Sequence, residues 1–249
     1  MSGHSKWSQI KRQKGVADVK RGAMFTKLGR ELAVAAKQGG GDPAANFRLR
    51  LAVQRAREAN MPLDTIDRAI KRAVGGGEGG ELEEITYEGY GPGGIAIIVD
   101  AMTDNRNRTA ASVRSIFDRG GGNLGESGSV AWQFKNRGVV TVDAKKGNTD
   151  EIELAAIDAG AVDVDSGDGE VQVYTEREDL DVVRRALTEA GLEVVSAELA
   201  MVPENTIELD EAKSIQTLKL LDRLESDDDV QKVYTPADFA ESAMAAYNA

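Results

Sequence analysis

Lysine and arginine side chains are concentrated at the start of the chain, where they could neutralise a polyanion. Residues 1–75 hold 16 Lys and Arg against 6 Asp and Glu, a formal charge of +10. Residues 76–249 hold 15 Lys and Arg against 36 Asp and Glu, a formal charge of −21. This asymmetry is typical of a polyanion-binding segment joined to an acidic body. Contacts between such cations and phosphates supply affinity with little sequence readout.

The basic residues fall on an N-terminal arm and on three predicted helices, the third of which carries Arg68, Lys71 and Arg72. The arm also carries Trp7, whose indole could stack on an unpaired base. In the second helix Arg48 and Arg55 are seven residues apart, as are Arg50 and Arg57, so each pair shares a face. A solvated helix surface is the alternative, but it would mix charges of both signs. The predicted nucleic-acid-binding residues are Lys6, Trp7, Lys11, Arg12, Lys14, Lys20, Arg21, Lys27, Arg30, Arg48, Arg50, Arg55 and Arg57.

A second polar motif, "TDNRNRT" at 103–109, lies at a predicted turn from a strand to a helix. Asp104 or Asn105 could cap the helix, which is the simpler interpretation. Arg106 and Arg108 could instead hold a phosphate or a partner's carboxylate beside the helix N-terminus. The sequence is compatible with either role for the motif, helix capping or anion binding.

Residues for enzymatic chemistry are scarce. His4 is the only histidine, it lies in the arm, and the chain has no cysteine. The glycine motifs at 89–94 and 120–125 lack the strand-before, helix-after context of a dinucleotide site. The acidic run at 163–170 lacks the ligand spacing of a calcium loop. The sequence therefore predicts no enzyme, cofactor or metal, and no apolar run is long enough to cross a membrane.

The elements that must position the basic residues are three short helices. Apolar residues recur at helical spacing, for example Phe25, Leu28, Leu32 and Ala36. Glycines and prolines separate the helices, with Asp42 and Asp64 as candidate N-caps. The predicted helices span 23–38, 45–60 and 65–74, and a glycine-rich linker follows at 75–84.

Two α/β patterns come after the linker. The first has strands at 84–90, 95–103 and 129–134 and a helix at 108–120. The second, over 138–202, follows the β-α-β-β-α-β order of a ferredoxin-like unit, with a hairpin around 167–169. A last helix at 210–229 and strand at 230–235 are too short to fold alone, so we expect them to complete the first sheet. The predicted class is α+β with three domains: 1–77, 82–134 plus 205–240, and an inserted 135–204.

Ordered blocks of the sequence resemble one known family. "GHSKW", "FTKL", "GGGDP", "ANMP", "ITYEGYGPGG", "TDNRNRT" and "GGNLGESGSVAW" together are similar to the YebC/PmpR family, and the resemblance covers nearly the whole chain. It implies a helical N-terminal domain, two α/β domains and a bacterial cytoplasmic protein, since mitochondrial relatives carry an additional leader. It supplies no catalytic residue.

The resemblance leaves two targets open. It implies a DNA-binding transcriptional regulator, and alternatively a ribosome-associated translation factor that binds ribosomal RNA. No helix-turn-helix signature is evident in the sequence, which weakens specific DNA readout. A basic arm with an aromatic residue suits irregular RNA. The acidic domains could contact basic ribosomal proteins. The first target is preferred by a small margin.

Overall fold

The computed structural model describes residues 18–75, 82–145, 149–167 and 169–248, and for 18–21 and 248 it describes the backbone alone. The chain forms two compact units. One contains the N-terminal helices and a sheet completed by residues near 230, and the other consists mainly of residues 132–208. Helices and antiparallel sheets both occur, so the α+β class is confirmed. The division into three domains stays a prediction.

Three helices form the N-terminal part: α2 (Asp18–Gly39), α3 (Phe47–Glu58) and α4 (Leu63–Val74). Their apolar faces meet in a core that includes Leu32, Leu49, Ala52 and Ile66. Helix α2 begins five residues earlier than the sequence pattern predicts. The predicted helix at 65–74 is present as α4, with Ile66 buried and Ala69, Ile70 and Ala73 packed on the same core.

Both predicted N-caps of these helices are wrong. The cap of α3 is Asn46, whose Oδ1 accepts the Leu49 N–H at 3.1 Å. Its Nδ2 donates to the carbonyls of Ala35 and Gly40, so this buried amide also ties α3 to the end of α2. Asp42 accepts the Ala44 N–H instead and stabilises the turn before the cap. Asp64 lies inside the first turn of α4 and pairs with Arg68 at 2.9 Å.

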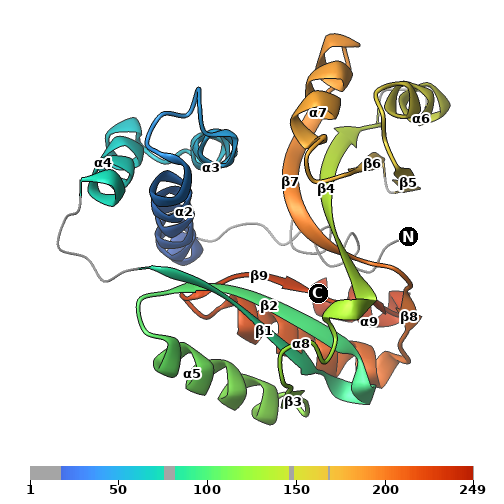
Figure 1. The fold of residues 1–249 in the computed structure, drawn as a ribbon. Helices are drawn as coiled ribbons and strands as arrows, with labels where there is room; N and C mark the ends of the chain where they lie inside the picture. The colour runs from blue at the N-terminus through green and yellow to red at the C-terminus, as the bar shows by residue number, and fades with distance from the viewer. Residues whose placement is uncertain (1–17, 76–81, 146–148, 168, 249) are drawn as a thin grey trace. The chain divides into compact units, whose positions relative to one another are not determined.

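The first sheet has the strand order β3-β1-β2-β9. Its strands are β1 (Glu83–Tyr90), β2 (Ala96–Thr103), β3 (Asn123–Leu124) and β9 (Val230–Tyr234). Strand β9 pairs antiparallel with β2, placing Tyr234 opposite Ile98, so the C-terminal segment returns to this sheet as expected. Helices α5 (Arg106–Arg119) and α8 (Glu211–Glu225) cover one face of it (Figure 1). A short helix α9 (Glu241–Asn248) follows, which the sequence pattern does not predict.

The predicted strand at 129–134 is wrong. Residues Ala131–Gln133 form a 3-10 turn, and only Phe134 belongs to a strand. The cause is Glu88, whose buried carboxylate accepts the backbone N–H groups of Gly128, Val130 and Ala131. Amide groups committed to a carboxylate cannot join a β ladder.

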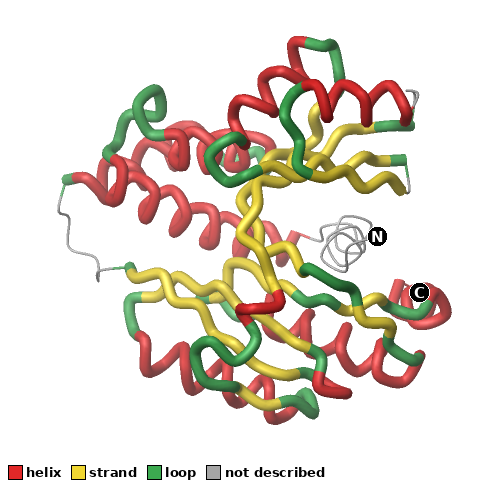
Figure 2. Tube along the Cα trace, turned by 45° about the vertical axis from the view of Figure 1, so that its right-hand side comes forward, coloured by secondary structure: helices red, strands yellow, loops and turns green. Residues whose placement is uncertain are grey.

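The second sheet has the strand order β5-β6-β4-β7. Its chain order is β4 (Phe134–Asp143), α6 (Thr149–Asp158), β5 (Asp163–Gly167), β6 (Glu170–Thr175), α7 (Leu180–Glu189) and β7 (Val194–Pro203). Both helices lie on one side of the sheet (Figure 2), where α6 buries Ile152 and α7 buries Leu180. Strands β5 and β6 pair antiparallel, as the predicted hairpin requires, with Gly167 opposite Glu170.

Two further short strands, β8 (Ile207–Glu208) and β10 (Ala237–Asp238), pair in parallel. Each is two residues long, so neither gives a period that sequence reasoning could detect. None of the helices within the described ranges is long and apolar enough to cross a membrane.

Candidate nucleic-acid interface

The predicted basic residues divide between parts of the chain that the structure describes to different extents. Lys6, Trp7, Lys11, Arg12 and Lys14 lie outside the described residues. Lys20 and Arg21 lie near the start of α2, where the backbone alone is described. The structure places the side chains of Lys27, Arg30, Arg48, Arg50, Arg55, Arg57, Arg106 and Arg108.

Two cations of α2, Lys27 and Arg30, contact the end of α8 and the segment between α8 and β9. Lys27 Nζ donates to the carbonyl of Glu225 at 2.6 Å. Arg30 donates to the carbonyls of Asp228 and Met102, and its Nη1 lies 2.8 Å from Asp229 Oδ1. These side chains therefore join the helices to the first sheet, and a phosphate would have to compete with the acceptors already present.

Asp229 is the centre of a polar network at this junction. Its carboxylate is nearly buried and accepts from Arg108, at 2.9 Å, and from Thr109 Oγ1, at 2.7 Å, besides Arg30. Thr103 Oγ1 approaches within 3.3 Å. Burial alone would raise the pKa of Asp229, but the hydrogen bonds from Thr109 and Arg108 and the charges of Arg30 and Arg108 lower its pKa overall. The network therefore holds the carboxylate ionised.

This network accounts for much of the "TDNRNRT" motif. Asn105 caps α5 by accepting the Arg108 N–H, as one interpretation predicts. Arg108 binds the carboxylates of Asp104 and Asp229. Arg106 is exposed, and its guanidinium lies 3.5 Å from Glu83. The motif thus has a structural role, while a phosphate contact by Arg106 or Arg108 stays a prediction.

Three of the four predicted arginines of α3 also contact acceptors within the chain. Arg48 binds the carboxylate of Glu84 and Gln38 Oε1. Arg55 lies 2.7 Å from Glu31. Arg50 donates to two carbonyls of the preceding turn, and its guanidinium lies over the Phe47 ring, 5.5 Å from the centroid. These residues position α2, α3 and β1 relative to one another.

Three cations differ from these arginines because their side chains face solvent: Arg57 at the end of α3, and Lys71 and Arg72 at the end of α4. All three side chains are exposed, and within the described parts of the chain none forms an ion pair or hydrogen bond. Cations in the last turn of a helix are stabilised by its dipole, which is the structural explanation for them. A phosphate can reach these three side chains without displacing another described partner.

Comparison with known proteins shows which family the chain belongs to. A model described as the TACO1/YebC protein N-terminal domain matches residues 5–76, and one described as the TACO1/YebC second and third domain matches residues 82–237. The chain belongs to the TACO1/YebC family. The resemblance stated from the sequence motifs is thereby confirmed.

Relatives of this TACO1/YebC chain are similar over their whole length. A "probable transcriptional regulatory protein" of Dehalococcoides mccartyi is 51% identical over 248 residues, covering 100% of this chain and 99% of the relative. One from Rubrobacter xylanophilus is 54% identical and covers 98% of each chain. The crystal structure of a conserved hypothetical protein from Aquifex aeolicus is 43% identical, with a TM-score of 0.84, and covers 90% of this chain and 93% of that one.

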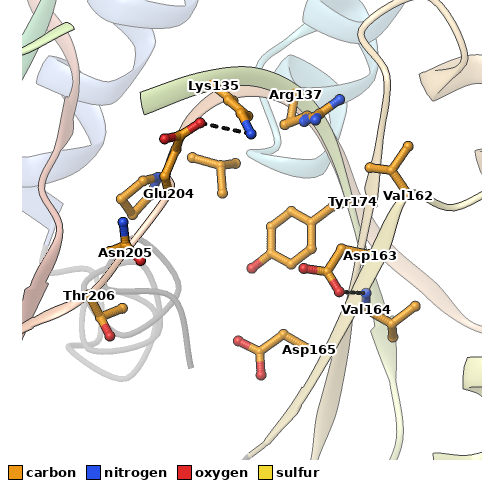
Figure 3. Close-up of a pocket in the computed structure, with 12 residues that line it drawn as sticks. Lys135, Arg137, Val162, Asp163, Val164, Asp165, Tyr174, Glu204, Asn205 and Thr206 are labelled. Atoms are coloured by element: carbon orange, nitrogen blue, oxygen red, sulfur yellow. Dashed lines mark hydrogen bonds and ion pairs between the residues drawn. The ribbon is translucent and has the colours of Figure 1, made fainter. Parts of the chain in front are cut away.

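A polar cavity of about 550 Å³ lies in the second unit of this TACO1/YebC chain. Lys135, Arg137, Asp163 and Asp165 contribute to its wall, and the Tyr174 ring lies among them (Figure 3). Both of its cations already have partners, because Lys135 binds Glu204 at 2.7 Å and Arg137 binds Glu176. Across the described residues no group of His, Asp and Glu side chains could hold a metal ion. The cavity therefore adds no second candidate site.

Four residues of functional interest in this TACO1/YebC chain are missing from the sequence-predicted site. Lys71 and Arg72 belong to the basic signal of the predicted third helix but not to the predicted contact residues, and their exposure at its C-terminal end becomes clear only in the fold. Asp229 belongs to an acidic run that resembles a solvated loop, and its burial depends on residues about 120 and 200 positions away. Trp132 falls in the wrongly predicted strand and is 73% exposed.

Proposed function

We propose that the chain is a cytoplasmic regulator of gene expression that binds nucleic acid through its N-terminal helices. The observation that carries this proposal is the set of exposed cations at the ends of α3 and α4, namely Arg57, Lys71 and Arg72. Phosphates attract such side chains without requiring a preformed pocket. The proposal involves no catalytic step, cofactor or metal.

DNA is the first target, because the relatives at about half identity are named as probable transcriptional regulatory proteins. One feature of the fold agrees with this choice. Helices α3 and α4 are joined by the four residues 59–62, the connection length of helix-turn-helix motifs. Asn60 has φ of 60° in this connection, the left-handed backbone that a tight turn requires. Helix α4 would then be the one that approaches the duplex.

Ribosomal RNA is the second target. Phosphate contacts do not distinguish DNA from RNA, and the strongly acidic remainder of the chain would suit basic ribosomal proteins. Cross-linking in cells followed by sequencing of the bound nucleic acid separates the two targets. Reads at a limited set of operator-like sites support transcription. Reads concentrated on ribosomal RNA refute it and support the second target.

The test of binding is a triple variant that combines Arg57→Ala, Lys71→Ala and Arg72→Ala. We expect weaker binding to labelled duplex DNA, and a log Kd against log [KCl] slope that is shallower by up to about 0.9 for each phosphate that the variant no longer neutralises. Fluorescence anisotropy at several salt concentrations measures both. The matched control removes the same charge elsewhere through Arg114→Ala, Arg119→Ala and Lys219→Ala. Equal slopes for the two triple variants would refute the assignment of the site.

A further inference from the structure

Helix α6 presents two large aliphatic side chains to solvent. Leu154 is 61% exposed and Ile157 is 62% exposed, and their spacing of three residues places them side by side on one face of the helix. The other face already supplies the core, because Ile152 and Ala156 are buried there. Isolated exposed apolar residues need no special explanation, whereas contiguous ones with a polar rim mark contact surfaces.

Carboxylates form the rim of this apolar pair. The helical neighbours of Leu154 include Asp150 and Glu151, one turn before it, and Asp158, one turn after it, and all three are exposed. Residues 147–176 hold nine Asp and Glu and neither Lys nor Arg. The α6 face, defined as Asp150, Glu151, Leu154, Ile157 and Asp158, is therefore apolar at its centre and negative around it.

Helix α7 lies on the same side of the second sheet and has an ordinary solvated surface (Figure 2). Its Asp181 binds Arg184 at 2.9 Å and Arg185 at 3.4 Å, so charges of both signs meet along the helix. Within α7, all of which the structure describes, Val182 is the one large apolar residue that is exposed. The α6 face differs from α7 in both respects, because its charge has one sign and its aliphatic side chains are paired.

We propose that the α6 face binds a basic protein segment that places an apolar side chain on Leu154 and Ile157. Lysine or arginine side chains of the partner would lie opposite the carboxylates, where they steer the encounter and fix the orientation. The aliphatic pair would supply the apolar centre that a protein interface needs.

The negative charge of the α6 face disfavours the other possible occupants. It repels the phosphates of nucleic acid and the headgroups of anionic lipid. Two copies of the chain that met through this face would bring the same carboxylates together across a two-fold axis. The inference goes beyond the proposed function and does not depend on it, because the face lies within α6 and uses none of the N-terminal cations.

A synthetic peptide tests the apolar centre. The probe is a fluorescein-labelled peptide of Lys, Leu and Ala, about 14 residues or four helical turns long, with its leucines on one face. Anisotropy measures its binding to the full chain. We expect the double variant that combines Leu154→Ala and Ile157→Ala to weaken binding roughly 10-fold, because the leucines of the peptide lose their apolar partners.

The matched control is the double variant that combines Val182→Ala and Val195→Ala. It removes two other exposed aliphatic side chains of the same unit, 55% and 38% exposed, and should bind the peptide as the wild type does. All four substituted residues are exposed, and thermal unfolding of each variant shows that the fold is retained.

Two further measurements separate this contact from simple charge attraction. A peptide in which serine replaces every leucine keeps its charge and should bind the wild type roughly 10-fold more weakly. Asp158→Asn should weaken binding of the leucine peptide roughly 3-fold, whereas Glu189→Gln, at the end of α7, should leave it unchanged. Equal affinity for the two peptides would overturn the inference, because charge alone would then explain the binding.

Hydrogen exchange locates the site on the full chain. Amides of α6 should exchange more slowly when the leucine peptide is bound, and amides of α7 should not change. The inference is overturned if the wild type does not bind the peptide, if the α6 double variant binds as tightly as the matched control, or if the protection falls outside α6. A wild-type dimer in sedimentation velocity that the α6 double variant loses would also overturn it and assign the face to a second copy of the chain.

The result is independent of nucleic-acid binding. The triple variant of Arg57, Lys71 and Arg72 should keep its affinity for the leucine peptide, and the α6 double variant should keep its affinity for duplex DNA. Failure of the wild type to bind nucleic acid would refute the proposed function and leave the α6 contact in place. Failure of the peptide measurements would do the reverse.

Discussion

Asp229→Asn is the substitution that most directly tests the polar junction between the N-terminal helices and the first sheet. The change keeps the size and shape of the side chain and removes its charge. Arg30 and Arg108 then face a neutral amide in place of a carboxylate. The amide must also present its oxygen to donors that currently reach both carboxylate oxygens.

The expected cost follows from how each partner is exposed. Hydrogen bonds to charged groups contribute about 1.5–3 kcal/mol each, and breaking a fully buried ion pair costs about 3–5 kcal/mol. Arg108 is 52% exposed and can recover water, whereas Arg30 is 21% exposed and can recover little. We therefore expect Asp229→Asn to lower the free energy of unfolding by about 2–3 kcal/mol.

Urea unfolding followed by far-UV circular dichroism measures this loss. With a slope of about 2–3 kcal/mol per molar urea, the unfolding midpoint should fall by about 1 M. Asp228→Asn is the matched control, because Asp228 is exposed and Arg30 uses only its backbone carbonyl. Equal midpoints for the two variants would show that the buried carboxylate does not stabilise the junction, and would refute the reasoning.

The stability difference between the wild type and Asp229→Asn should also depend on pH. The pKa of Asp229 is lowered in the folded chain, so its contribution is present above the unfolded pKa of about 3.9 and is lost as pH falls through the folded value. The wild type and Asp229→Asn should therefore differ most at neutral pH and converge in acid. A difference that stays constant down to the acid unfolding range would contradict the assigned charge state.

Three further substitutions test local features. Asn46→Ala removes the cap of α3 and two hydrogen bonds to carbonyls, so urea unfolding should show a free energy of unfolding lower by about 2 kcal/mol. Asp42→Ala should change the same free energy by less than about 1 kcal/mol. A larger loss for Asp42→Ala than for Asn46→Ala would show that Asp42 is the more important residue. Glu88→Gln should cost about 1–3 kcal/mol and speed amide hydrogen exchange at Gly128, and unchanged exchange would contradict its role in holding the turn. Gly29 lies in the middle of α2, and a Cβ added there meets nothing within 4 Å. Gly29→Ala should therefore raise the free energy of unfolding by about 0.5–1 kcal/mol and raise the thermal midpoint. A lower midpoint would show that the side chain at 29 has no room.

Local sequence patterns predict most elements of this fold because the elements are short and separated by glycine and proline. The helical period on α4 is present in the structure, and β6 forms where the sequence pattern predicts a strand. What fails is local structure decided by distant partners. The 129–134 segment has strand-like residues, but its amides are taken by Glu88, about 40 residues earlier in the chain. No window around 129–134 contains that information.

The candidate site is less predictable for the same reason. Composition locates the excess of positive charge in the first 75 residues, but it cannot distinguish a cation that meets solvent from one that meets a carboxylate. Arg30 and Arg57 have the same chemistry and both occupy predicted helices. Only the fold shows that Arg30 meets Asp229, more than 190 residues away, whereas Arg57 meets solvent.

This distinction changes what a count of basic residues means for binding. A phosphate that recruits Arg30 must first break its bond to Asp229, and the gain from the new contact is offset by leaving a carboxylate without that partner. A phosphate that recruits Lys71 or Arg72 displaces only water and counterions. Among the cations whose side chains the structure describes, those at the ends of α3 and α4 should therefore contribute most to net affinity, even though they are a minority. The part of a measured salt slope that α2, α3 and α4 contribute should then correspond to fewer neutralised phosphates than their number of lysines and arginines suggests.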